Sequence, residues 1–309
     1  MESKINLPLY FKAKNASRSS RERVNLQPKP NGRSADFIMA GFATGCQLAC
    51  TYCYVARHRA FGNPLETYSN LEDILAATKS HWMKLPVKTP NQVDPVYWVY
   101  DIGENTDPLT PAVLSLTRRT VEFFLQETGA KPSFATKVAG AARLPILEGE
   151  QRRRARVRVS LMPPHLSRLL ERGTSPVGLR LETANALAER GYEVHLNFSP
   201  VVVYEGWVKD YEALFDLVNR TLTPAVKENT AAEVIFLTHH PTLHEMNLRW
   251  NAAGEDYLWT PRWQETKTTH RGDKGVLRYK ALTVKRVLVE HFRTLLAQRL
   301  PFCPIRYIF

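Results

Sequence analysis

The stretch Gly45-Cys46-Gln47-Leu48-Ala49-Cys50-Thr51-Tyr52-Cys53-Tyr54 holds three of the four cysteines of the chain. Its spacing, C-x3-C-x2-C, supplies three thiolates within eight residues and then stops. Closed zinc sites and ordinary iron–sulfur centres use four protein ligands. A 4Fe–4S cluster held by three cysteines leaves one iron open, and an open metal position is where a metal takes part in chemistry. The stretch therefore predicts an enzyme whose metal ligands are Cys46, Cys50 and Cys53.

A zinc site completed by His58, or a chance group of buried thiols, would also account for these cysteines. Soft thiolate ligands select iron–sulfur clusters or zinc over hard cations, so ligand type alone leaves the zinc site open. The rest of the chain has one cysteine, Cys303, and this scarcity argues against a chance group. We expect Cys303 to be a packed residue.

Length and composition indicate a globular protein. With 309 residues and 44% hydrophobic content, the chain can bury one large core, as one barrel-sized domain or as two smaller ones. No run approaches the ~18 apolar residues of a membrane helix, and the first residues lack the apolar core of a signal peptide. These features predict a cytoplasmic protein with reduced thiols and no membrane partner.

The charge balance favours a polyanionic partner. The 42 Lys and Arg against 30 Asp and Glu give a net charge of +12, so DNA is a reasonable partner. Basic runs occur at 18–23, 152–158 and 270–280, and each taken alone fits a solvated surface face better. The alternation within 152–158 predicts a strand with one polar and one apolar face.

The order of apolar runs predicts an α/β fold with a mostly parallel sheet. We expect six strands in an open partial barrel, with the ligand at their carboxyl ends and the cysteine loop after the first strand. The expected strands are Phe37–Ala43, Val96–Asp101, Ser133–Lys137, Val157–Leu161, Glu193–Phe198 and Glu233–Thr238. The expected helices are Asn70–Met83, Pro111–Thr128, Val177–Arg190, Val208–Leu222 and Leu282–Arg299, the third with an apolar face at Leu179, Ala184 and Leu187.

Three segments are expected along the chain. Residues 1–34 are polar and aperiodic, which is typical of an extended arm. Residues 35–245 would form the partial barrel. Residues 246–309 would form a C-terminal extension with a basic loop and a closing helix.

The cysteine stretch resembles the cluster loop of radical S-adenosylmethionine (SAM) enzymes. Four further segments, at 134–137, 171–176, 200–207 and 305–309, are similar to the spore photoproduct lyase family. This resemblance, from about residue 36 to the end, implies a radical SAM partial (β/α)6 barrel. It also implies a 4Fe–4S cluster, SAM, and an electron donor such as a flavodoxin or ferredoxin. In that family a 5'-deoxyadenosyl radical takes hydrogen from a thymine dimer of ultraviolet-damaged DNA. The oligomeric state stays open.

The resemblance also assigns roles to residues of the pocket. It places Lys137 near the SAM carboxylate, Ser160 in a hydrogen bond to SAM, and Ser199-Pro200 on the adenosine side. Gly103-Glu104 looks like the short motif that holds the SAM amino group. Tyr52 and Tyr54 match tyrosines of the radical relay. Alternatives are a surface lysine, a turn with an exposed acid and packed tyrosines.

One departure from the family concerns the hydrogen donor. The family has a cysteine at the end of the second strand, which returns a hydrogen atom to the thymine radical. Here the strand contains no cysteine, and the matching position falls near Val99, or at Tyr100 or Asp101. We expect Tyr100, or alternatively Tyr97, to be the donor, helped by Tyr52 or Tyr54. Cys303 could serve only if the tail folds over the barrel mouth.

The nucleic-acid contact is expected in the C-terminal third, where a turn has basic flanks. The resemblance places this segment at a hairpin that enters the lesion, and a flipped-out base suits a wedge of basic and aromatic residues. A solvent-exposed basic loop is the alternative. The candidate residues are His270, Arg271, Lys274, Arg278, Tyr279 and Lys280.

Two functions remain open. The first is a DNA-repair lyase acting on a thymine photoproduct. The second is a radical SAM enzyme of the same family that acts on another substrate, a nucleotide or a protein, and consumes SAM. The missing donor cysteine favours the second, as does the block Thr106-Asp107-Pro108, which is similar to a block in broader radical SAM relatives of the lyase. The overall charge and the long-range resemblance favour the first. A non-enzymatic zinc module is disfavoured because its fourth ligand is missing.

Overall fold

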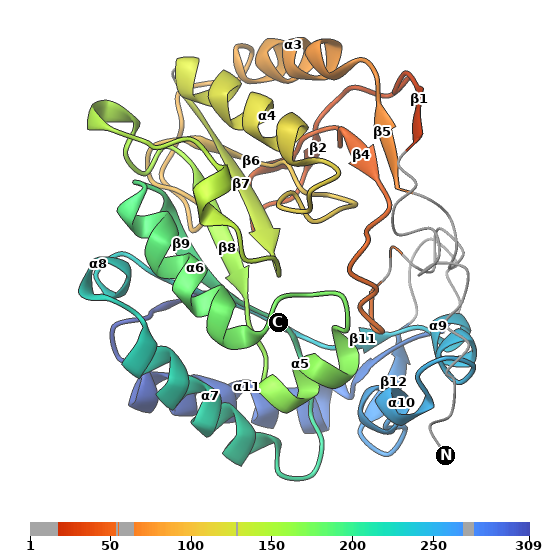
Figure 1. Ribbon diagram of the computed structural model, residues 1–309. Coiled ribbons are helices and arrows are strands. Elements are labelled where there is room, and N and C mark those ends of the chain that lie inside the picture. Colours follow the sequence, from red (N-terminus) through yellow and green to blue (C-terminus); the bar gives the residue numbers. More distant parts are fainter. Residues whose placement is uncertain (1–17, 54, 56–64, 128, 268–274) are drawn as a thin grey trace.

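The computed structural model describes residues 18–53, 55, 65–127, 129–267 and 275–309 (Figure 1). Its centre is an eight-stranded sheet in the order β14-β10-β9-β8-β7-β6-β3-β2. All neighbours are parallel except β2 and β3. The strands are β2 (Lys29–Pro30), β3 (Phe37–Ile38), β6 (Trp98–Asp101), β7 (Ala130–Thr136), β8 (Arg156–Ser160), β9 (Glu193–Val201), β10 (Ala232–Phe236) and β14 (Ile305–Ile308).

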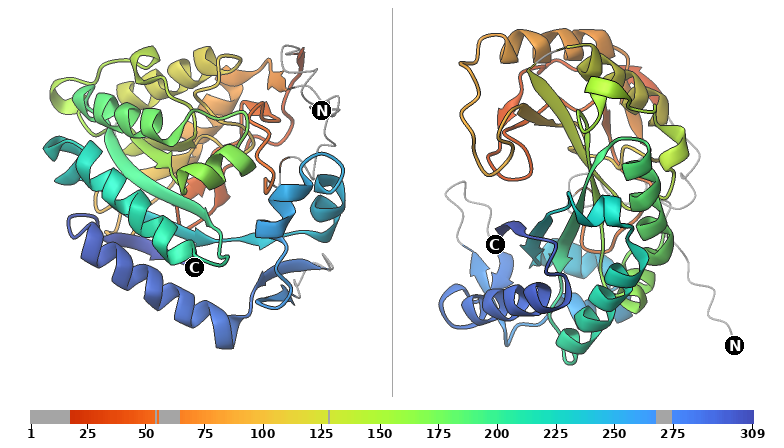
Figure 2. Two further views of the ribbon diagram at one scale, coloured as in Figure 1. Left: turned by 60° about the horizontal axis from the view of Figure 1, so that its bottom comes forward. Right: turned by 90° about the vertical axis from the view of Figure 1, so that its left-hand side faces the viewer.

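The sheet curls into an open half-barrel, with the helices on its outer face (Figure 2). The helices are α3 (Leu71–Trp82), α4 (Leu114–Gln126), α5 (Pro164–Leu170), α6 (Val177–Glu189), α7 (Trp207–Thr221), α8 (Pro224–Lys227), α9 (Pro241–Asn247), α10 (Ala252–Leu258) and α11 (Arg286–Arg299). Alternate strand residues such as Val157, Val159 and Leu196 belong to the apolar core. The predicted α/β class and mostly parallel half-barrel are confirmed.

Two small sheets flank the half-barrel. The first strand was predicted as Phe37–Ala43, but only Phe37–Ile38 joins the main sheet. The rest of that run leads into β4 (Ala43–Thr44), which pairs with β5 (Glu66–Tyr68), and β5 also pairs with β1 (Arg18–Arg21). On the opposite side, β11 (Thr238–His239) and β12 (Gln264–Lys267) pair with β13 (Val276–Tyr279).

Among the described residues, no helix combines the length and apolar character that crossing a bilayer requires.

Two predicted faces are corrected by the structure. The strand of the 152–158 run is present, but its polar face is not solvated, because Arg156 and Arg158 are buried inside the half-barrel. On α6, Leu179 is 46% exposed while Arg180 is only 1% exposed. The inward face of α6 therefore uses Leu181 in place of Leu179.

The amino-terminal end of the half-barrel is closed by buried ion pairs. Lys131 Nζ lies 3.1 Å from Asp94 Oδ2, and Arg156 Nη2 lies 2.9 Å from the same oxygen. Arg156 Nε also lies 2.7 Å from Glu193 Oε1, and Lys131 contacts Glu193 as well. Burial alone would raise the pKa of Glu193, but a hydrogen bond from His195 and the charges of Arg156 and Lys131 hold that pKa well below its usual range. Each acid in this layer therefore has basic partners.

Candidate active site

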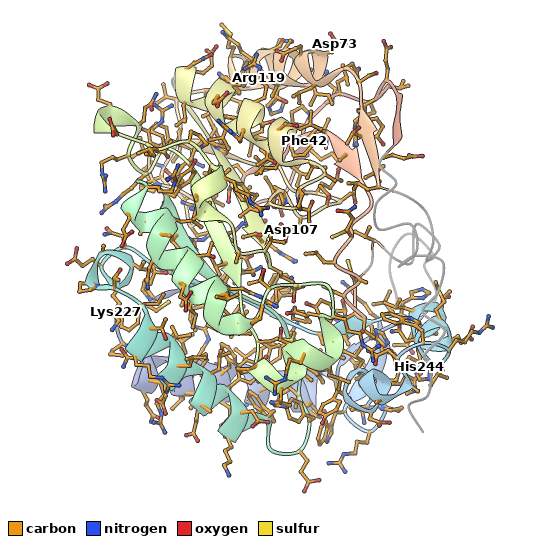
Figure 3. All side chains as sticks on the ribbon, viewed as in Figure 1. Phe42, Asp73, Asp107, Arg119, Lys227 and His244 are labelled. Atoms are coloured by element: carbon orange, nitrogen blue, oxygen red, sulfur yellow. The ribbon has the colours of Figure 1, made fainter. Side chains whose placement is uncertain are left out.

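A pocket of about 430 Å³ lies at the carboxyl-terminal ends of the strands. Residues near the ends of β6, β7, β8, β9 and β10 line it together with the cysteine loop. Asp107, one of its lining residues, lies in the inner part of the molecule (Figure 3). The fold therefore places the pocket at the edge of the sheet where the sequence predicts a ligand.

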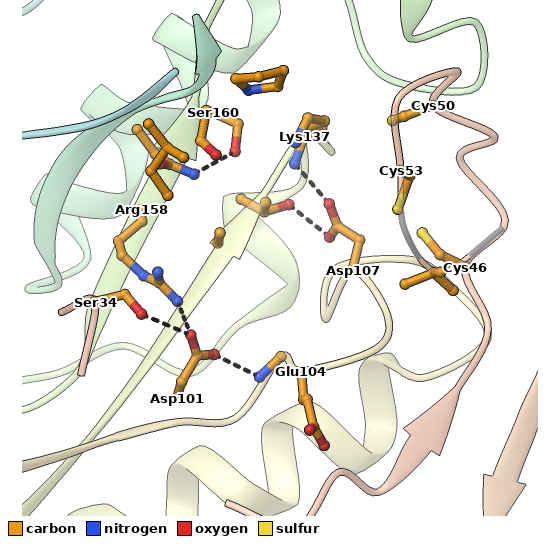
Figure 4. A pocket seen from close by; sticks show the side chains of 18 of the residues that line it. Ser34, Cys46, Cys50, Cys53, Asp101, Glu104, Asp107, Lys137, Arg158 and Ser160 are labelled. Carbon is orange, nitrogen blue, oxygen red and sulfur yellow. Dashed lines mark hydrogen bonds and ion pairs between the residues drawn. The ribbon is translucent and has the colours of Figure 1, made fainter. Parts of the chain in front are cut away.

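The three cysteines face this pocket together. Cys46, Cys50 and Cys53 all line it, and Figure 4 shows them side by side on the wall near Lys137 and Asp107. Burial raises the pKa of the Cys46 thiol to about 12 and that of Cys50 well above its usual value. A coordinating metal deprotonates such thiols. Three soft ligands at one pocket wall fit an iron–sulfur cluster.

The segment 171–176 and the residue before it contact the backbone of the cysteine loop. Thr51 N donates to Leu170 O at 2.8 Å, and Gly173 N donates to Leu48 O at 3.0 Å. A methyl group at Gly173 would lie 2.5 Å from Leu48 O, so this close approach requires glycine. The resemblance at 171–176 thus has a local reason, because these residues position the loop.

Lys137 lies inside the pocket and is not a surface lysine. Its backbone N donates to Asp107 Oδ2 at 2.7 Å, and its Nζ lies 3.9 Å from Glu171 Oε1. Burial alone would lower the pKa of Lys137, but the Glu171 carboxylate and Cys50 raise it. The side chain therefore carries a positive charge beside the cysteine wall.

Glu171 connects Lys137 to Tyr52. Tyr52 lines the pocket, and its hydroxyl donates to Glu171 Oε1. Arg180 Nη2 lies 2.7 Å from Glu171 Oε2 and also donates to Ser167 Oγ. Burial alone would raise the pKa of Glu171, but Arg180 and Lys137 lower it. Glu171 is therefore an ionised carboxylate that orients the Tyr52 hydroxyl.

The remaining predicted cofactor residues also line the pocket. Ser160 and Ser199-Pro200 come from the adjacent strands β8 and β9, and Asn197 Nδ2 donates to Ser160 Oγ at 3.1 Å. Gly103 and Glu104 follow β6, and Glu104 is paired with Arg23 at 3.5 Å and Lys29 at 3.2 Å. Its carboxylate is thus engaged by the N-terminal segment.

Tyr100 lies outside the pocket, contrary to its predicted role as hydrogen donor. It is fully buried, its hydroxyl lies 2.7 Å from His81 Nδ1, and its ring packs against Phe37. Side chains alternate along a strand, so Tyr100 points toward the helices while Asp101 points into the pocket. Tyr54, the other predicted relay residue, lies outside the described residues, as does His58.

Cys303 is also unable to serve as the donor. It is a packed residue, as predicted, and burial raises its pKa to about 12. It precedes Pro304, whose carbonyl accepts from Ala232 N at the start of β10. The pocket lies at the other end of that strand, so the tail does not bring this thiol to the barrel mouth.

The wall opposite the cysteines was not predicted (Figure 4). Arg158 Nη2 lies 2.5 Å from Asp101 Oδ2, and Arg158 Nη1 lies 3.4 Å from Glu233 Oε2. The Tyr307 hydroxyl donates to Glu233 Oε2 at 2.7 Å. Asp101, Arg158 and Tyr307 all line the pocket. The alternation in β8 could have indicated Arg158, but the approach of Tyr307 depends on how β14 pairs with β10.

Of the basic segment in the C-terminal third, the structure describes β13, which pairs antiparallel with β12, and the residues that follow it. Arg278 pairs with Glu265 at 3.1 Å, and Lys280 Nζ donates to Arg262 O at 2.8 Å. Tyr279 is 1% exposed, and its hydroxyl accepts a hydrogen bond from Val203 N. It is therefore a core residue, and its predicted role in an aromatic wedge is wrong. His270, Arg271 and Lys274 lie outside the described residues.

A family model described as spore photoproduct lyase matches residues 12–249 of this chain. The chain belongs to the spore photoproduct lyase family. It is 29% identical over 214 residues to the spore photoproduct lyase of Bacillus subtilis strain 168, which covers 69% of this chain and 59% of that protein. It is 27% identical over 172 residues to the Clostridium acetobutylicum enzyme, covering 55% of this chain and 48% of the relative. The chain thus matches about half of the length of these relatives.

Solved structures of spore photoproduct lyase share the fold. A variant with bound AdoMet and dinucleoside spore photoproduct superposes with a TM-score of 0.83 at 22% identity, covering 97% of this chain and 84% of that one. A complex with dinucleoside spore photoproduct gives the same values. This likeness supports the half-barrel described above.

Proposed function

We propose that this chain is a radical SAM enzyme that binds a 4Fe–4S cluster through Cys46, Cys50 and Cys53. The observation that carries the proposal is the convergence of these three thiols on one wall of the pocket at the carboxyl ends of the strands. When bound, the cluster and SAM supply a 5'-deoxyadenosyl radical after one-electron reduction, with a flavodoxin or ferredoxin as the electron donor. Free thiols and an oxygen-sensitive cluster suit a reducing compartment, the cytoplasm.

The residues around the cysteines would bind and orient SAM. Lys137 carries its charge beside the cysteine wall and would pair with the SAM carboxylate. Ser160 and Ser199-Pro200 would line the adenosine side. Glu104, held by Arg23 and Lys29, would accept a hydrogen bond from the SAM amino group. Gly103 would let SAM approach the backbone closely. Tyr52, fixed by Glu171, would supply a hydrogen atom to the radical relay.

The proposed substrate is a thymine photoproduct in DNA. Membership of the spore photoproduct lyase family and the net charge of +12 support this choice. A solved relative holds a dinucleoside spore photoproduct, which is the same class of ligand. Two described basic residues, Arg278 on β13 and Lys280 directly after it, would contact phosphates.

A second candidate is the same radical chemistry on another nucleotide or on a protein, with SAM consumed. The pocket position at the end of β6 holds Asp101, a carboxylate paired with Arg158. A carboxylate cannot return a weakly held hydrogen atom as a thiol does. This wall therefore favours a polar substrate group and a reaction in which the hydrogen stays on 5'-deoxyadenosine.

One experiment tests both candidates. The protein is reconstituted anaerobically with iron and sulfide, then given SAM and reductant with or without an oligonucleotide that contains the photoproduct. For the lyase candidate we expect lesion reversal, with SAM regenerated when the radical is recycled. A reconstituted protein that holds no cluster, or that yields neither 5'-deoxyadenosine nor repaired thymines, contradicts the enzyme proposal. SAM cleavage without lesion reversal contradicts the lyase candidate and favours the second one.

A further inference from the structure

Two histidines and a glutamate meet outside the pocket, next to the cysteine loop. His239 is the last residue of β11, His244 lies on α9 near one end of the molecule, and Glu255 lies on α10 (Figure 3). One ligand atom from each residue lies within 4.8 Å of the other two. His239 Nε2 is 2.9 Å and His244 Nδ1 is 2.6 Å from Glu255 Oε2. None of the three lines the pocket.

The charge of Glu255 lacks a permanent cationic partner. Its carboxylate lies within hydrogen-bond distance of His239 Nε2, His244 Nδ1 and Asn247 Nδ2. Its side chain is only 2% exposed. Among the described residues, no Lys or Arg lies within ion-pair distance of it. A buried charge of this kind requires a compensating positive charge.

The burial of His239 limits how the charge of Glu255 can be balanced. This histidine is 1% exposed, and its Nδ1 is buried without a hydrogen-bond partner among the described residues. Protonating both ring nitrogens would therefore bury a charged N–H without an acceptor. A neutral His239 leaves the carboxylate charge uncompensated. A cation held by His239 Nε2, His244 Nδ1 and Glu255 Oε2 would supply that positive charge while the His239 ring keeps a single proton, on Nδ1.

We propose that His239, His244 and Glu255 bind one divalent transition-metal ion, with Zn²⁺ or Fe²⁺ as the candidates. Two imidazoles and one carboxylate are a known ligand set for both ions and leave positions for water. Ligands about 2.0–2.1 Å from one tetrahedral ion are roughly 3.3 Å apart, so the two short contacts to Glu255 would open by about half an ångström. The His244 side chain is 20% exposed and gives the ion a route from solvent.

Neighbouring side chains hold these ligands in place. Trp259 stacks on the His244 ring with centroids 4.1 Å apart and planes 12° apart. Asn247 Nδ2 donates to Glu255 Oε1 at 2.5 Å, which leaves Oε2 for the ion. Such outer contacts are typical of metal sites, where they orient the ligands.

The site is connected to the cysteine loop through Thr51. Asn247 Nδ2 also donates to Thr51 O at 2.9 Å, and Asn251 Nδ2 donates to Thr51 Oγ1 at 2.8 Å. Thr51 lies between Cys50 and Cys53. A metal that fixes α9 and α10 would therefore also fix the base of this loop.

The test uses the full chain carrying Cys46→Ser, Cys50→Ser and Cys53→Ser, so that no thiolate of the loop binds metal. The chelator-treated protein is dialysed against Zn²⁺, and in an anaerobic arm against Fe²⁺, and bound metal is counted. We expect one equivalent of bound metal per chain. When Zn²⁺ and Fe²⁺ compete for the protein, the ion that stays bound identifies the metal. Glu255→Gln should weaken binding at least tenfold, whereas His291→Ala, an exposed histidine of α11, should leave it unchanged.

Circular dichroism of each variant separates metal loss from unfolding. A folded protein that takes up less than a tenth of an equivalent of either ion overturns the proposal. A folded Glu255→Gln variant with unchanged affinity overturns it equally. If Glu255→Gln fails to fold, His244→Ala provides the same comparison at a partly exposed position. Because the background lacks the cluster ligands, the outcome is independent of the proposed enzymatic function.

Discussion

The two ends of the half-barrel use similar charges for different purposes. At the amino-terminal end, Lys131 and Arg156 pair with Asp94 and Glu193 in a closed layer. At the carboxyl-terminal end, Lys137, which directly follows β7, and Arg158 of β8 line an open pocket. Each charge of the first set is paired with an opposite charge of the protein, and the second set faces a space that a ligand can enter.

This difference shows how a single strand serves stability and chemistry at once. Arg156 and Arg158 are two residues apart on β8 and therefore point to the same side. Arg156 meets Glu193 on the neighbouring strand, whereas Arg158 meets Asp101 at the pocket rim. We expect substitutions at the amino-terminal end to change the free energy of unfolding and substitutions at the pocket to change the chemistry.

The largest expected effect is at the cysteine wall. Cys50→Ser removes one of three proposed iron ligands, so we expect the reconstituted protein to lose its cluster and to produce no detectable 5'-deoxyadenosine. The fold should persist in this variant, because Cys50 forms no disulfide that the substitution would remove. Iron analysis, the visible spectrum and SAM cleavage measure the effect. A variant with full cluster content would contradict the ligand assignment, and Cys303→Ser is the matched control.

At the closed end, Glu193→Gln should lower the free energy of unfolding by about 3 kcal/mol, because it leaves Lys131 and Arg156 partly unpaired in a buried layer. Glu72→Gln is the matched control, since Glu72 is 66% exposed in its pair with Arg119 and should cost less than about 1 kcal/mol. Urea unfolding measures both. Equal losses in the two variants would show that burial does not distinguish these ion pairs.

Lowering the pH should reduce the free energy of unfolding, because the interior of the half-barrel holds ionised glutamates. Glu193 and Glu233 both have a folded-state pKa below the usual glutamate value, despite burial, because His195 and neighbouring arginines favour the carboxylate. A lowered pKa contributes stability above the unfolded-state pKa of about 4.3, and this contribution is lost as pH falls below it. The urea midpoint should therefore decrease between pH 5 and pH 3. In Glu193→Gln the decrease should be smaller.

Behind the cysteine loop, Gly173→Ala should reduce cluster content and cost roughly 2 kcal/mol of stability, since its methyl group would lie 2.5 Å from Leu48 O. Gly178→Ala, in α6, is the control: nothing lies within 4 Å of its added methyl group. Alanine should be neutral or stabilising there. Iron content and the melting temperature are compared. Wild-type iron content in folded Gly173→Ala would show that the loop tolerates displacement.

The smallest effect is expected for Tyr100→Phe. The hydroxyl forms a hydrogen bond with His81 Nδ1 and lies outside the pocket, so its removal should cost about 1 kcal/mol and leave SAM cleavage unchanged. Tyr52→Phe, which alters the pocket, should reduce product formation. If Tyr100→Phe blocks product formation while SAM cleavage continues, Tyr100 belongs to the radical relay and its assignment to the core is wrong.

Local patterns predicted much of the fold. The six predicted strands form the central strands of the sheet, and the helix pattern located α3, α4, α6, α7 and α11 to within a few residues. This worked because periodicity and short-range spacing reflect which side chains share a face. The three cysteines could be identified for the same reason, since eight consecutive residues contain them all.

The tertiary structure decided what each face meets. The alternation around Arg156 and Arg158 predicted a polar face, but only the curl of the sheet turned that face into a buried interior. Tyr100 and Asp101 are neighbours in sequence, and the direction of β6 sends one to the core and the other to the pocket. The meeting of Tyr307 with Glu233 and of His239 with Glu255 likewise depends on pairing and packing between separate elements. Ligand types and strand periods can be predicted from the residues alone, because both are local properties. Which charges are closed off and which line a pocket depends on contacts between distant segments.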